Sequence, residues 1–176
     1  GVFAGIIIAC VIISIGVQMF QNSQLKSLLS IAVVDSNYNH DEQVEALQND
    51  FLAYAGTGDK HEVVDVDTSL LSGDDYNAVV KMTVVMGAGT ADMMFCGEET
   101  YKKYKQQEAF LSWKEILGDD YSKYEEYMTD DGRLDLEKCP NWEKYNMVYY
   151  SPVYAVVMSS SKNLENCIKF LEMMVQ

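Results

Sequence analysis

Three clusters of polar side chains have the residue types of a ligand-binding site, and each follows a short apolar run typical of a buried strand. Carboxylate, hydroxyl and amide groups are the groups that orient a small ligand in a pocket. In a parallel α/β sheet, ligands meet the carboxyl ends of the strands, so we predict that these clusters form a binding site. The candidate residues are Asp35, Ser36 and Asn37; Asp67, Thr68 and Ser69; and Gly97 and Glu98.

The alternative is that polar residues near these strand ends only cap helices. Asn39 with Glu42, and Ser72 with Asp75, have the spacing of capping boxes. Capping nearly suffices to explain these positions. It does not fully explain three polar residues in succession at 67–69.

Motifs for catalysis or metal binding do not occur in the sequence. His40 and His61 are the two histidines, both expected at the surface, and no nucleophile elbow, zinc-protease motif, P-loop or dinucleotide motif is present. The acidic turn at 130–133 fits a calcium loop poorly, because alignment puts Tyr127 and Cys139 at ligand positions. We therefore predict that the protein is not an enzyme and uses no metal or cofactor. A hydrolase that uses scattered carboxylates is the less favoured alternative.

A sheet with helices on both faces would bring the polar clusters together. Strands alternate with helices in the pattern of parallel βαβ units, whose crossovers are right-handed. We expect an α/β fold with three αβα layers and a mainly parallel sheet, whose strand order begins 2-1-3. A last strand at 153–158 and a helix after Asn163 should return to this sheet. The first strands are expected at 29–35, 61–68 and 91–96, and the helices at 39–55, 72–86 and 98–107.

The first residues of the chain are predicted to form one transmembrane helix. Residues 2–20 contain no charged side chain. At ~1.5 Å per residue they span about 28 Å, close to the ~30 Å hydrocarbon core of a bilayer. A cleaved signal peptide is disfavoured, because its apolar core is usually only ~7–15 residues long and no Ala-x-Ala site follows here. We divide the chain into a membrane helix with its connector at 1–24 and an extracytoplasmic domain at 25–176.

Charge gives the orientation and excludes some partners. Lys26 is the only lysine or arginine between Gln21 and Lys60, and a flank so poor in basic residues is easily exported. We therefore expect a single-pass protein of the cell membrane with its C-terminal domain outside the cytoplasm. The formal net charge of −14 excludes general nucleic-acid binding and disfavours contact with anionic lipid.

Six segments match one known pattern: 74–80, 89–95, 99–104, 109–111, 154–159 and 163–171. Together they resemble one lobe of bacterial extracellular solute-binding proteins of the periplasmic binding protein type II kind. The chain is also similar to uncharacterised single-pass bacterial membrane proteins that carry such a lobe after an N-terminal anchor. A second lobe does not fit between 98 and 146, which is about half the length of an ordinary domain. The resemblance therefore implies a single binding lobe without the clamshell.

The expected function is that of a membrane-anchored binding domain with an unknown ligand. Its partners would be a small molecule or an envelope protein, and the lipid bilayer would contact residues 2–20. The alternative is a scaffold or assembly subunit of an envelope complex, which would use a tyrosine-rich face as its contact. That face would consist of Tyr121, Tyr124, Tyr127, Tyr149 and Tyr150.

Overall fold

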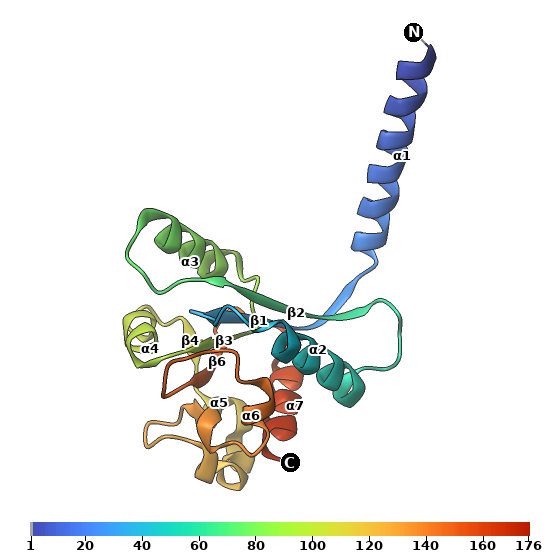
Figure 1. Cartoon of the computed structure of the whole chain (residues 1–176). Coiled ribbons are helices and arrows are strands. Elements are labelled where there is room, and N and C mark those ends of the chain that lie inside the picture. The colour runs from blue at the N-terminus through green and yellow to red at the C-terminus, as the bar shows by residue number, and fades with distance from the viewer. Residues whose placement is uncertain (1) are drawn as a thin grey trace.

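The computed structural model describes residues 2–176, in which one long helix projects from an α/β body (Figure 1). This helix is α1 (Val2–Ser23), and only Gln24 and Leu25 separate it from the first strand of the body. One β-sheet lies at the centre of the body, and helices pack on both of its faces. The α/β class and the N-terminal apolar helix are therefore confirmed.

The sheet has the order β2-β1-β3-β6-β4, with β5 also paired to β6, so the predicted start 2-1-3 is confirmed. The prediction of a mainly parallel sheet is wrong, because β6 runs antiparallel to β3, β4 and β5. Right-handed βαβ crossovers determine the direction only of the strands that they connect, which here are the parallel strands β1, β2 and β3. The strands are β1 (Lys26–Val34), β2 (Glu62–Leu70), β3 (Met93–Cys96), β4 (Phe110–Leu111), β5 (Leu134–Asp135) and β6 (Tyr154–Met158).

Side chains of β1 alternate between two hydrophobic cores, one on each face of the sheet. Val33 belongs to the larger core, with Phe51 from α2 and Phe170 from α7. Val34 belongs to the smaller core, with Met82 from α3. The helices of the body are α2 (Asp41–Ala55), α3 (Tyr76–Ala88), α4 (Glu98–Lys105), α5 (Trp113–Leu117), α6 (Trp142–Tyr145) and α7 (Leu164–Val175). Short 3₁₀ helices occupy Gly118–Lys123, Glu125–Tyr127 and Leu136–Lys138.

The helix caps differ from those expected. The residue before α2 is His40, which makes no capping hydrogen bond through its side chain, so the predicted Asn39 cap is wrong. The Ser72 cap is wrong too, because α3 is capped by Asp75, whose carboxylate accepts from two backbone N–H groups. The capping box in the structure is at α5, where Ser112 and Glu115 cap the helix reciprocally.

Asp92 connects the parallel strand β1 with the antiparallel strand β6. Its buried carboxylate accepts hydrogen bonds from Ser30 N (3.0 Å), Ser161 Oγ (2.7 Å) and Asn163 Nδ2 (3.1 Å). Its backbone N–H donates to Ser30 O and its backbone carbonyl accepts from Met158 N, both at 2.8 Å. Asp92 therefore connects β1, β6 and the segment that leads into α7.

Candidate functional site

A cleft of about 260 Å³ lies where β1 and β3 end, and we call it the strand-end cleft. Three of the predicted site residues, Asp35, Gly97 and Glu98, line it. This is the edge of the sheet at which parallel strands place ligands. The rest of its lining comprises Ser72, Glu99, Thr100, Tyr150, Ser151 and Pro152.

The other five predicted residues do not line this cleft, and hydrogen bonds hold several of them in local structure. Ser36 Oγ donates to Thr68 O at 2.8 Å, so the first and second clusters meet each other. The carboxylate of Asp67 accepts from both the N–H and the hydroxyl of Ser69. The N–H of Asn37 donates to the carbonyl of Met147.

Asp35 turns the chain at the end of β1. Its φ angle of 51° lies in the left-handed region, which aspartate tolerates better than most residues. Its N–H donates to Leu70 O at 2.9 Å, and its carboxylate accepts from Ser72 N at 3.0 Å. Asp35 therefore holds the end of β2 beside the cleft and presents a carboxylate there.

Tyr150 forms one wall of the cleft. Its hydroxyl is shared between the carbonyls of Val34 (2.9 Å) and Phe95 (3.3 Å), at the ends of β1 and β3. Burial raises the pKa of Tyr150, so its side chain is neutral at physiological pH. A Cβ atom at Gly97 would lie 3.2 Å from this ring, which explains why glycine suits that position. Tyr150 was not among the predicted binding residues, because its partner Val34 lies 116 positions earlier in the chain.

Arg133 holds Glu98, one of the residues that line the cleft, in position. Its Nη1 donates to Glu98 at 2.6 Å, and its Nε donates to Asp131 at 2.8 Å. Its guanidinium lies 4.4 Å from the ring centre of Tyr101 and 4.3 Å from that of Tyr154. The hydrogen bond from Arg133 is the main cause that lowers the pKa of Glu98, so this carboxylate is ionised at neutral pH.

Asp35 and Glu99 give the cleft its unbalanced negative charge. Neither residue forms an ion pair with any Lys, Arg or His in residues 2–176. The cleft therefore combines two uncompensated carboxylates with an aromatic wall. The carboxylates attract a cation through their charge.

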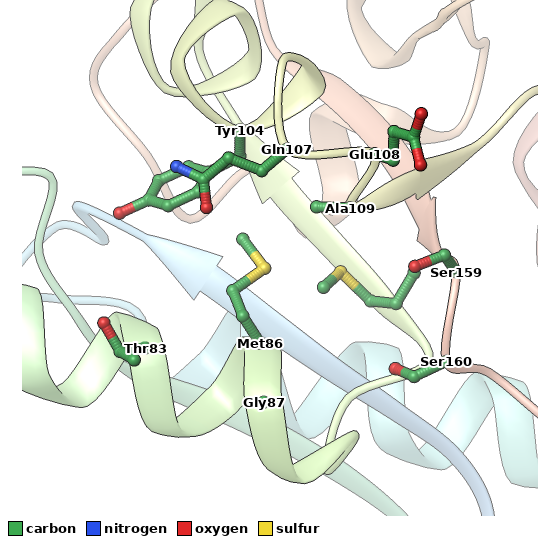
Figure 2. Close-up of a pocket in the computed structure, with 10 residues that line it drawn as sticks. Thr83, Met86, Gly87, Tyr104, Gln107, Glu108, Ala109, Ser159 and Ser160 are labelled. Carbon is green, nitrogen blue, oxygen red and sulfur yellow. The ribbon is translucent and has the colours of Figure 1, made fainter.

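A second hollow, of about 290 Å³, lies between α3 and the segment that connects α4 to β4. Figure 2 shows Met86 of α3 directed across it toward Tyr104 and Ala109, whereas the carboxylate of Glu108 points away. The hydroxyl of Thr83 donates to Val79 O within its own helix. This hollow thus offers mostly apolar surface and has no charged group directed into it.

Other chemistry-bearing residues lie outside the strand-end cleft. His61 contacts Asp59 at 2.9 Å, and neither histidine lines the cleft. No group of three or more His, Cys, Asp or Glu residues is placed to hold a metal in the part of the chain that the structure describes. Burial raises the pKa of the thiols of Cys96, Cys139 and Cys167 to about 12.

The five tyrosines of the scaffold hypothesis do not form one exposed face. Four of them are partly buried and pack against the larger core. Only Tyr149 is largely exposed, at 77%. A tyrosine contact surface therefore has little structural support.

No protein-family model matches this chain, and no curated protein or solved structure matches it either. The resemblance to a solute-binding lobe therefore stays a prediction. What the fold and the cleft define is an α/β domain with an acidic, aromatic-walled cleft, preceded by one long apolar helix.

Proposed function

We propose that this protein is a membrane-anchored binding domain, exposed outside the cytoplasm, whose strand-end cleft takes a small cationic ligand such as an amine. The observation that carries the proposal is that Asp35 and Glu99 line this cleft without a cationic partner in residues 2–176, beside the ring of Tyr150. The resemblance to one lobe of a solute-binding protein supports binding as the activity.

The anchor is supported by the composition and surroundings of α1. Its segment Ala4–Ser23 is 20 residues long, apolar enough to cross a membrane, and not buried against the body. An apolar helix without a protein cover is stable in lipid. The scarcity of basic residues after it supports export of the body. A signal sequence has the same composition, so processing of the N-terminus has to be measured.

Fractionation of expressing bacteria tests the anchor. We expect the tagged chain to stay in the membrane pellet after alkaline carbonate, to have an intact mass that retains α1, and to be digested by protease added to spheroplasts. A mature mass that begins after α1 would identify a signal sequence and contradict the anchor. Protection from external protease would contradict the orientation.

The protonation states in the cleft favour binding over acid–base catalysis. Arg133 lowers the pKa of Glu98 and burial raises the pKa of Tyr150, so both groups keep a fixed charge state near neutral pH. A general acid or base has to exchange its proton near the working pH. Groups with a fixed charge are instead suited to holding a ligand.

Thermal unfolding of the full chain in detergent micelles tests the ligand class. Lysine, putrescine and spermidine are expected to raise the melting temperature, whereas glucose and glutamate are not, since ligands that bind only the native state stabilise it. Asp35→Asn and Glu99→Gln should reduce the shift caused by the amines. Asp41→Asn, at a fully exposed acid of α2, is the matched control and should leave it unchanged. No shift with amines, or an equal shift with glucose, would contradict the proposal.

A further inference from the structure

The outer face of α3 carries a stripe of exposed apolar side chains. Outside α1, ten large hydrophobic side chains are exposed, and five of them lie between Leu71 and Val84. Tyr76, Val80 and Val84 recur at four-residue spacing, so they form one stripe along the helix. Tyr76 is 81% exposed and Val84 is 56% exposed. We call Tyr76, Val79, Val80 and Val84 the α3 outer face.

The opposite side of the same helix is already buried. Ala78, Met82 and Val85 of α3 pack into the smaller core beneath it. A continuous apolar stripe on a helix is normally covered by another layer. In this chain the body covers only one side, so the α3 outer face needs a cover from elsewhere.

The charges on α3 indicate which kind of partner covers its outer face. Among the helices α2 to α7, it alone contains no Asp or Glu, although the chain carries a net charge of −14. Its one charged side chain is Lys81. The acids that precede it have other roles, since Asp75 caps the helix and Asp74 forms a 2.9 Å ion pair with Lys103. An apolar face without acidic residues is suited to the boundary between lipid headgroups and acyl chains.

The position of α1 places a bilayer close to this face. In Figure 1, α1 leaves the body on the side of the sheet that α3 covers. Only Gln24 and Leu25 connect α1 to β1, so the body cannot move far from the point where α1 enters the membrane.

We propose that the α3 outer face lies on the surface of the same bilayer that α1 spans, with its apolar side chains at the headgroup–acyl boundary. This inference rests on the proposed membrane anchor and adds a second contact with lipid to it. The lipid at this contact is zwitterionic, because the acidic body is repelled by anionic headgroups. The contact fixes which surface of the body faces the membrane.

Quenching by brominated lipid tests the contact in the full chain. Tyr76→Trp is reconstituted into phosphatidylcholine vesicles with plain or brominated acyl chains. The native Trp113 and Trp142 are only 1% and 4% exposed, so the unsubstituted chain gives the baseline. We expect brominated lipid to reduce the emission of the added tryptophan by about twofold or more, as for an interfacial side chain.

Asn49→Trp is the matched control, because α2 packs on the other face of the sheet. The emission that this substitution adds should be the same in vesicles of plain and of brominated lipid. Adding Val80→Asp and Val84→Asp to the Tyr76→Trp chain should remove the quenching while circular dichroism remains unchanged.

Carbonate extraction of the same vesicles separates the two proposals. A chain that stays in the vesicles but shows no quenching at position 76 overturns the α3 contact and leaves the anchor in place. A chain released by carbonate overturns both. Blue-shifted emission without quenching would mean that a second copy covers α3, and it would also overturn the lipid contact.

Discussion

Arg133 donates a 2.6 Å hydrogen bond to Glu98, which lies 35 positions earlier in the chain at the first turn of α4. The guanidinium of Arg133 lies 4.4 Å from the ring centre of Tyr101 and 4.3 Å from that of Tyr154. One side chain thus joins α4, β6 and the turn before β5. It also holds Glu98, which lines the cleft, in position.

Arg133→Met removes the guanidinium while it keeps most of the apolar stem. We expect the free energy of unfolding to fall by about 2 kcal/mol. Hydrogen bonds to charged groups contribute ~1.5–3 kcal/mol, and partial hydration of Glu98 weakens this one. Urea denaturation in micelles measures this. Lys123→Met breaks an exposed ion pair with Asp120 and should cost much less than Arg133→Met, because solvent screens exposed ion pairs. Equal losses for the two variants would show that Arg133 acts only as surface charge.

The lowered pKa of Glu98 predicts a stability contribution that depends on pH. The folded pKa is below the unfolded value, so the contribution is complete above the ordinary glutamate pKa. It is lost as the pH falls through the lowered folded value. Glu98→Gln should therefore be less stable than the unsubstituted chain at neutral pH, and the gap should narrow on acidification. Urea titrations at a series of pH values measure the gap, and a gap independent of pH would contradict the linkage.

Asp92→Ala removes the acceptor of three hydrogen bonds that connect β1 with the segment before α7. We expect the free energy of unfolding to fall by about 2–4 kcal/mol, because donors at a buried site lose their partner. Asp92→Asn should lose less, since one acceptor oxygen remains. Asp74→Ala, at an exposed acid, is the control for lost charge. Thermal unfolding compares the three variants, and similar melting temperatures would refute the structural role of Asp92.

The cysteines predict a labelling pattern. Three thiols are buried in the body and have a raised pKa, and Cys10 lies in α1. In vesicles, a polar maleimide should modify none of the four, because reaction needs an accessible thiolate and the proposed membrane anchor would place Cys10 in lipid. After denaturation in detergent all four should react, as counted by mass spectrometry. Rapid labelling in vesicles that Cys10→Ser abolishes would show that α1 is in water.

The elements that could be predicted from the sequence are those with a clear hydrophobic period. The strand order starting 2-1-3 follows from βαβ units, whose chirality is nearly invariant. The direction of β6 could not be predicted, because the chain reaches it through short helices and turns between Ser112 and Val153 that impose no crossover rule. Helix caps were missed at α2 and α3, since several polar residues compete there for the same backbone groups.

The site could be predicted in part. The rule for strand ends located Asp35, Gly97 and Glu98 at one cleft, because it depends only on strand order. Tyr150 and Arg133 were missed, since they come from irregular segments distant in sequence whose placement depends on tertiary packing.

The interior position of β6 affects how the chain folds. This strand lies between β3 and the pair β4 and β5, so β3 keeps one open edge until residues 154–158 have been synthesised. Contacts between such distant segments form slowly, because a long loop has to close first. During that interval the apolar edge of β3 is open to pairing with another chain. Refolding yield should therefore decline as protein concentration rises.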